Sequence, residues 1–122
     1  MRRQVAALAV AVVTVLGLSA CGSSHSSGAD SNLPTKFIDI TVNGRDVTPN
    51  GTDIDVAVGQ RIELDVNADA PGEIHVHSSP EEQEFQYDKG SSTFEVKPIP
   101  APGQVVVESH TLDKTLFTLV AR

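Results

Sequence analysis

The feature that most limits the possible folds of this chain is an alternation of apolar and polar positions from Lys36 onward. The apolar positions of three successive runs are Ile38, Ile40 and Val42, then Ile54, Val56 and Val58, then Ile62, Leu64 and Val66. A period of two is that of a β-strand with one face in a core and the other in water. The alternation therefore predicts strands in this region.

Turn-forming residues separate these runs at short intervals, at Asn43-Gly44, Pro49-Asn50-Gly51, Pro71-Gly72, Lys89-Gly90 and Pro102-Gly103. Further strands are expected at residues 74–77, 92–97, 105–110 and 116–121, and a turn of helix at Ser79–Gln83. The aromatic residues expected in the core are Phe85, Tyr87, Phe94 and Phe117. About seven short strands with frequent turns predict an all-β domain over residues 36–122, either a β-sandwich or a small Greek-key barrel.

Residues 1–20 have the three parts of a signal for export. Arg2 and Arg3 precede an apolar run over residues 5–18, which is short for a permanent membrane helix of about 20 residues. The run ends in Leu18-Ser19-Ala20-Cys21-Gly22, which resembles the lipobox of bacterial lipoproteins. This resemblance implies that Cys21 is acylated, that residues 1–20 are removed, and that the protein is anchored on the extracytoplasmic face of the cell membrane. The alternative is an ordinary signal peptide or an uncleaved anchor with an incidental cysteine.

The segment that follows Cys21 is rich in glycine and serine and has no apolar periodicity. Residues 22–32 read GSSHSSGADSN, and residues 21–35 are therefore predicted to be the lipidated cysteine and a flexible tether. His25 lies in this tether and is interpreted as a bystander. The single cysteine excludes an intramolecular disulfide.

The charge of the chain limits its partners. Without Arg2 and Arg3, seven basic and 16 acidic residues remain, a formal charge of −9. Such a surface repels the phosphate backbone, so no nucleic-acid partner is expected. It also gives no electrostatic attraction to anionic lipid, so attachment to the bilayer must come from the acyl chains on Cys21.

Three histidines of the expected domain are candidate metal ligands. His75 and His77 are two residues apart on one strand, so their side chains share a face, roughly 7 Å apart. His110 can add a third imidazole from another strand, and Glu108 alternates with it. These donors suit Cu(II) or Zn(II), and two histidines with a carboxylate also suit iron. The alternative is that the histidines belong to a solvated strand face. The loop that follows holds the acidic residues Glu81, Glu82, Glu84 and Asp88, which could attract cations toward the site but are interpreted as a solvated charge run.

The stretches GQRIELDVNADAPGEIHVHSSPEE and FEVKPIPAPGQVVVESHTLDKTLFTLVAR resemble cupredoxin-like domains of small bacterial lipoproteins and periplasmic metal-handling proteins. The resemblance implies a Greek-key sandwich of seven to eight strands, with His75 or His77 and His110 at one end. Blue-copper sites add a cysteine thiolate and an axial methionine. Val107 or Glu108 stands where that cysteine would lie, and the only cysteine and methionine are Cys21 and Met1. A blue-copper electron carrier is therefore not expected.

The function expected from these features is binding, not catalysis. The membrane-anchored domain would bind copper, zinc or a similar divalent ion through His75, His77 and His110, with Glu108. An alternative is a degenerate cupredoxin fold that serves as an interaction module for another envelope protein. The His-Val-His sequence also occurs in copper/zinc superoxide dismutases, but those enzymes need several more histidines, an aspartate and usually a disulfide.

Overall fold

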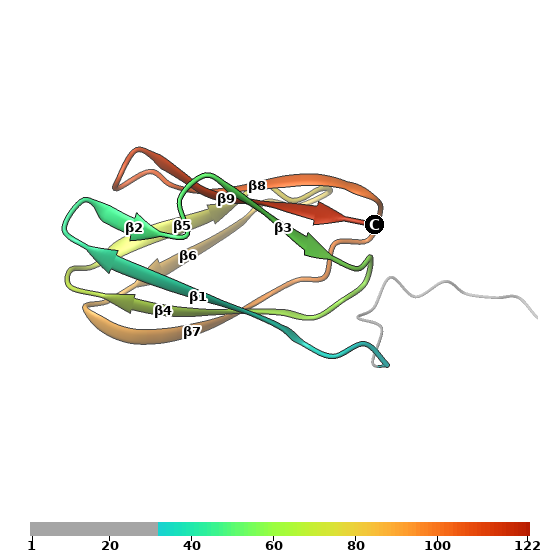
Figure 1. The fold of residues 1–122 in the computed structure, drawn as a ribbon, viewed down its shortest axis with the longest axis horizontal. Helices are drawn as coiled ribbons and strands as arrows, with labels where there is room; N and C mark the ends of the chain where they lie inside the picture. The colour runs from blue at the N-terminus through green and yellow to red at the C-terminus, as the bar shows by residue number, and fades with distance from the viewer. Residues whose placement is uncertain (1–31) are drawn as a thin grey trace, which may run out of the picture.

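The computed structural model describes residues 32–122, so the expected signal, Cys21 and the tether up to residue 31 lie outside the described residues. Within residues 32–122, nine strands form two sheets that pack face to face (Figure 1). The strands are β1 (Lys36–Asn43), β2 (Asp46–Thr48), β3 (Thr52–Val56), β4 (Ile62–Ala68), β5 (Gly72–Val76), β6 (Gln83–Tyr87), β7 (Gly90–Val96), β8 (Gly103–Ser109) and β9 (Lys114–Ala121).

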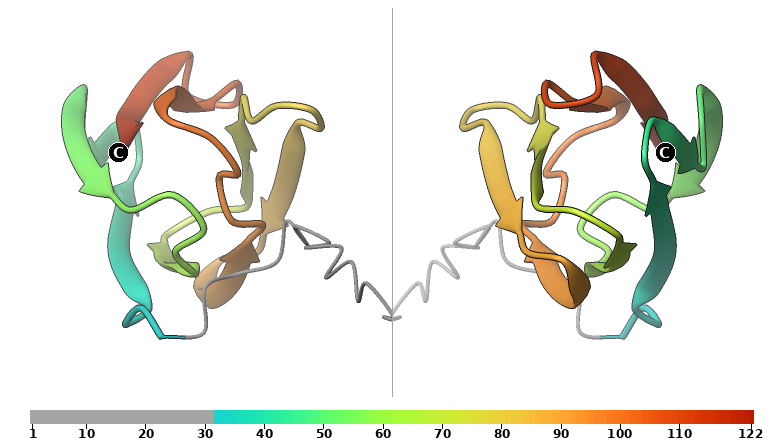
Figure 2. Two further views of the ribbon diagram at one scale, coloured as in Figure 1. Left: turned by 90° about the vertical axis from the view of Figure 1, so that its right-hand side faces the viewer. Right: turned by 90° about the vertical axis from the view of Figure 1, so that its left-hand side faces the viewer.

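One sheet has the order β2-β1-β4-β7 and the other has the order β3-β9-β8-β5-β6. The pairs β1–β4 and β3–β9 are parallel, and the other pairs are antiparallel. The end-on views of Figure 2 show the two layers enclosing a common interior. This arrangement confirms the expected all-β sandwich.

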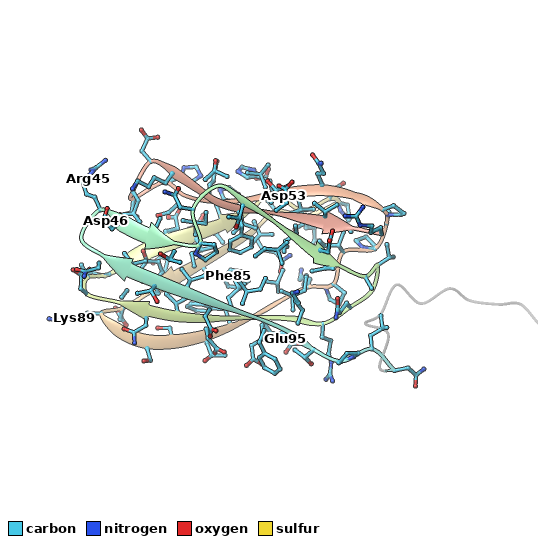
Figure 3. All side chains as sticks on the ribbon, in the orientation of Figure 1. Arg45, Asp46, Asp53, Phe85, Lys89 and Glu95 are labelled. Carbon is cyan, nitrogen blue, oxygen red and sulfur yellow. The ribbon has the colours of Figure 1, made fainter. Side chains whose placement is uncertain are left out.

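The core contains the apolar members of the alternating runs. On β1 and β4, Ile40 and Leu64 are among the fully buried side chains, and the polar residues between the core positions face outward. Phe117 on β9 heads the fully buried side chains by volume. Tyr87 is buried, and Phe85, labelled in Figure 3, packs against the core together with Phe94. The expected core positions of the four aromatic residues are thus confirmed.

Two features differ from the expectation. β2 and β6 are additional strands, and within residues 32–122 the segment Ser79–Gln83 contains no helical turn. That segment is an irregular loop because its polar groups bond to side chains instead of to a helical backbone: Ser78 Oγ donates to the Glu81 carbonyl over 2.6 Å. Within the described part of the chain, no helix is long and apolar enough to cross a membrane.

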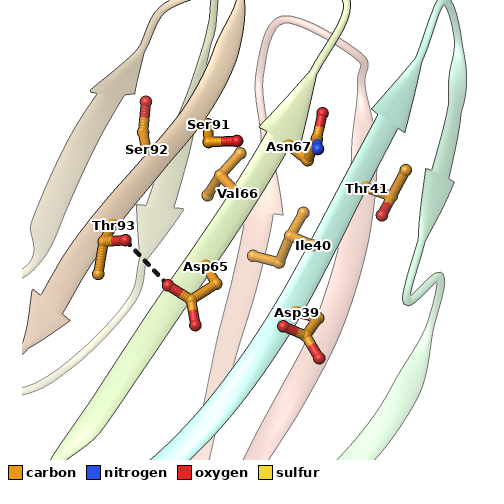
Figure 4. A pocket seen from close by; sticks show the side chains of 9 residues that line it. All are labelled: Asp39, Ile40, Thr41, Asp65, Val66, Asn67, Ser91, Ser92 and Thr93. Atoms are coloured by element: carbon orange, nitrogen blue, oxygen red, sulfur yellow. Dashed lines mark hydrogen bonds between the residues drawn. The ribbon is translucent and has the colours of Figure 1, made fainter.

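The outer faces of the two sheets differ in chemistry. The face of the four-stranded sheet has an open hollow of about 490 Å³ over β1, β4 and β7 (Figure 4). Its polar lining consists of carboxylates, an amide and hydroxyls, and Thr93 Oγ1 donates to Asp65 Oδ1 over 2.9 Å. The hollow contains none of the candidate histidines, which lie on the five-stranded sheet.

Candidate metal centre

The first two site residues lie opposite each other on the outward face of the five-stranded sheet. Ile74 and Val76 on β5 are buried, so His75 between them points away from the core. On β8 the same alternation buries Val107 and leaves Glu108 facing outward. The antiparallel register pairs His75 directly with Glu108. Side chains of directly opposed residues share a face, so the fold itself brings this imidazole and this carboxylate together.

His77 and His110 each lie one residue beyond a strand end and join the same face. The backbone N–H of His77 donates to the Val106 carbonyl over 2.9 Å, which extends the β5–β8 pairing by one residue. His110 follows the buried Ser109 at the start of the β8–β9 turn. The three imidazoles thereby meet: each offers a ring nitrogen, and these nitrogens all lie within 4.8 Å of one another.

The contacts within the cluster link four donor atoms in a row. His77 Nε2 lies 2.7 Å from Glu108 Oε1, and this oxygen lies 3.2 Å from His110 Nε2. His110 Nε2 lies 3.1 Å from His75 Nδ1. A tetrahedral cation bound at 2.0–2.1 Å would hold its donors about 3.4 Å apart. The separations of neighbouring donors, 2.7–3.2 Å, are near that spacing, so these four atoms are candidate ligands of one cation.

The rings are stacked, which keeps them in one compact group. The ring centroids of His75 and His77 are 4.3 Å apart with an interplanar angle of 17°. Those of His75 and His110 are 5.1 Å apart with an angle of 26°. The side chain of His75 is 17% exposed and that of His110 is 54% exposed, so the cluster is open to solvent on the His110 side.

Glu82 is a site residue that the sequence interpretation missed. Its Oε2 lies 3.1 Å from His75 Nε2, and its Oε1 lies 3.3 Å from His77 Nδ1. The interpretation of the acidic run as merely solvated is therefore wrong for Glu82. The contact follows from the strand register and not from a sequence pattern: β6 pairs with β5 in a hairpin, and continuing the register Val76↔Gln83 by one residue puts Glu82 opposite His77.

The position of the cluster also differs from the one that the family resemblance implies. His110 lies at the start of the β8–β9 turn, whereas His75 projects from β5 itself and His77 continues the same sheet face one residue beyond it. The cause is the strict alternation of β5, which sends Ile74 and Val76 into the core and leaves the histidines no inward position. The site is a surface site on a sheet, not one enclosed between the two layers.

The two carboxylates raise the pKa of His77 above its usual value of 6.5. The hydrogen bond to Glu108 has the largest effect, the bond to Glu82 comes second, and desolvation opposes both. Hydrogen bonding to His77 likewise lowers the pKa of Glu108 and that of Glu82. A cation at His77 Nε2 must displace the proton that this nitrogen donates to Glu108. Metal affinity should therefore rise as the pH rises through the His77 pKa.

Replacing Glu108 by glutamine should lower the pKa of His77, because the change removes the strongest charge-assisted hydrogen bond to its imidazolium. Glu84→Gln should leave that pKa unchanged, since Glu84 Oε1 accepts a hydrogen bond from Gln86 at 3.4 Å. Titration of the imidazole C–H signals by NMR measures both. A His77 pKa below 6.5 in the unsubstituted protein would contradict the assignment.

Comparison with known proteins identifies the architecture. No protein-family model and no curated protein sequence matches the chain. Among solved structures, it is similar to reduced auracyanin of Roseiflexus castenholzii, with a TM-score of 0.53 and 13% identity over 71% of this chain and 97% of the other. Auracyanin A of Chloroflexus aurantiacus, a blue copper protein, gives 0.54 and 12% over 73% and 100%. A Cu(I) form of amicyanin gives 0.54 and 10% over 80% and 95%. Residues 32–122 therefore form a cupredoxin-like β-sandwich.

Proposed function

We propose that this protein is a lipid-anchored, extracytoplasmic module that binds one divalent cation through His75, His77 and His110, with Glu108. The observation that carries the proposal is the row of donors from His77 Nε2 through Glu108 Oε1 and His110 Nε2 to His75 Nδ1. Two hydrogen-bonded carboxylates beside three imidazoles also place negative charge where a cation would neutralise it. The proposed role is metal binding without catalysis.

The donor chemistry favours Cu(II) or Zn(II). Imidazole and carboxylate suit these borderline ions, whereas thiolate and thioether select Cu(I). The only cysteine and methionine of the chain are Cys21 and Met1, so residues 32–122 offer no sulfur ligand. A blue-copper site depends on a cysteine thiolate. We therefore propose a role other than that of a blue-copper electron carrier.

Anchoring at the membrane is supported by the sequence around Cys21. The apolar run and the Leu-Ser-Ala-Cys-Gly segment are those of a lipoprotein signal, and two or more acyl chains are needed for stable attachment. The domain would then face the extracytoplasmic space. Mass spectrometry of the membrane fraction tests this proposal, with Cys21→Ser as the control: an unmodified thiol at position 21 would exclude the anchor.

Titration with Zn(II) and Cu(II) tests the metal site. The tested chain runs from Gly22 to Arg122, so it keeps every strand described above and lacks the thiol. It should bind one equivalent of either ion. A free amino terminus near a histidine can itself bind Cu(II), so His25→Ala is the matched control and should bind equally well. Absence of any stoichiometric site in both proteins would refute the proposal.

The alternative function is that of an interaction module without metal. One observation favours it: each ring nitrogen of His75 and His77 already has a hydrogen-bonding partner within the chain. Such a network is complete without an ion, and the open outer face of the sheet would then contact an envelope protein. The same titration separates the two functions, because this alternative requires no stoichiometric metal binding.

A further inference from the structure

Glu82 contacts His75 and His77 through the ring nitrogens that face away from the other donors. On His75, Nδ1 faces His110 and Nε2 faces Glu82. On His77, Nε2 faces Glu108 and Nδ1 faces Glu82. We propose that Glu82 is a positioning residue, whose carboxylate accepts a hydrogen bond from each histidine and fixes both in the tautomers that bind the cation. This inference rests on the proposed function.

The chemistry of imidazole explains how such a carboxylate acts. A neutral imidazole has one N–H and one lone pair, and the hydrogen bond made by one nitrogen decides which form the other takes. With both outer N–H groups donated to Glu82, the lone pairs of His75 Nδ1 and His77 Nε2 point to the shared site. Carboxylates that hold metal-binding histidines in this way also make the imidazole a stronger donor.

The loop around Glu82 holds this carboxylate in place although its side chain is 60% exposed. On one side, Glu81 is fixed by the Ser78 hydroxyl and by an ion pair of 2.6 Å with Lys97 Nζ. On the other side, Gln83 Nε2 donates to Ser78 Oγ over 3.0 Å, and its Oε1 accepts the Lys97 backbone N–H over 2.7 Å. Both neighbours of Glu82 are thus bound to Ser78 and Lys97, and Ser78 is itself buried.

Glu84 provides a matched comparison within the same acidic run. It lies directly opposite His75 in the β5–β6 register and has the same charge as Glu82. Among the described residues its hydrogen bond is to Gln86, and none joins it to a histidine. A long-range attraction of cations would depend on both carboxylates, whereas fixation of the tautomers depends on Glu82 alone.

The experiment compares Glu82→Gln with Glu84→Gln in the full mature protein. Zn(II) affinity is measured by competition with a chelator. Loss of such an outer carboxylate weakens metal binding by about 10–100-fold, which is the increase in Kd expected for Glu82→Gln. Glu84→Gln should stay close to the unsubstituted protein. Equal losses in the two variants, or no loss in Glu82→Gln, would overturn the inference.

Two spectroscopic readouts separate positioning from direct ligation and from mere folding. The ¹⁵N shifts of the Zn(II)-bound protein should show Nε2–H on His75 and the less common Nδ1–H on His77, and Glu82→Gln should mix these forms. The EPR signal of the Cu(II) protein should keep its donor set in Glu82→Gln; a changed set would make Glu82 a ligand and overturn the assignment. If no metal binds the unsubstituted protein, the proposed function fails; if metal binds but neither the affinity nor the ¹⁵N shifts depend on Glu82, this inference alone fails.

Discussion

Replacing His75 and His77 together by alanine should weaken binding of Zn(II) by more than about 100-fold, because it removes two of the four donors. Removal of a carboxylate outside the donor set already costs about 10–100-fold, so loss of two ligands must exceed it. His110 and Glu108 remain in the variant and lie 3.2 Å apart, but two donors cannot complete a tetrahedral set. Competition with a chelator measures the loss.

Thermal unfolding gives an independent measurement of the same site. Zn(II) at a hundredfold excess over Kd should stabilise the unsubstituted domain by about 2.7 kcal/mol, since it binds the folded state. For a domain of this size the midpoint should rise by roughly 10–20 °C. The double variant should show no such rise. Both histidines face outward, so its metal-free midpoint should change little. A zinc-dependent rise retained in the double variant would refute the assigned ligands.

The fold could be predicted from sequence to the extent that side-chain period determines burial. In β1 and β4 the apolar positions alternate without interruption, and the structure buries them on one face. β2 could not be found in this way, because a strand of three residues is too short to show a period. The partners of each strand also could not be predicted from the sequence, because the five-stranded sheet places β3 beside β9 and β8 beside β5, which are far apart along the chain.

The histidines of the candidate site could be predicted from the sequence, but the contact of Glu82 and the local strand register could not. The spacing of His75 and His77 requires a common face on any strand, and this holds although His77 lies beyond the end of β5. The contact of Glu82 depends on a hairpin between β5 and β6, and its loop was expected to contain a helical turn. No sequence pattern indicates the register shift between Val107 and Glu108 in the β8–β9 pairing, although Glu108 is a site residue.

The location of the cluster has a consequence for its chemistry. The imidazoles lie on the outer face of a sheet, and the core beneath them is closed by Ile74, Val76 and Val107. Metal binding therefore does not require the sandwich to open. Substitutions in the site and in the core should consequently act on different properties: the former on affinity, the latter on stability.

Replacing Phe117 by alanine should destabilise the domain by about 3–5 kcal/mol, the usual cost of truncating a fully buried phenylalanine. Phe117 is 0% exposed, lies on β9 between β3 and β8, and is paired with Thr52 and Val107. The truncation removes apolar contacts and leaves a cavity that two sheets cannot easily close. The midpoint of thermal unfolding should fall by on the order of 20 °C. Circular dichroism or calorimetry measures it.

Phe37→Ala is the matched control for this loss. Phe37 is 60% exposed on the outer face of β1, so its truncation should change stability by no more than about 0.5 kcal/mol. If Phe117→Ala does not fold, Val107→Ala tests the same packing with a smaller truncation, expected to cost roughly 1–3 kcal/mol. Equal losses of stability from Phe117→Ala and Phe37→Ala would contradict the arrangement of the sheets, because they would mean that Phe37 is buried as fully as Phe117.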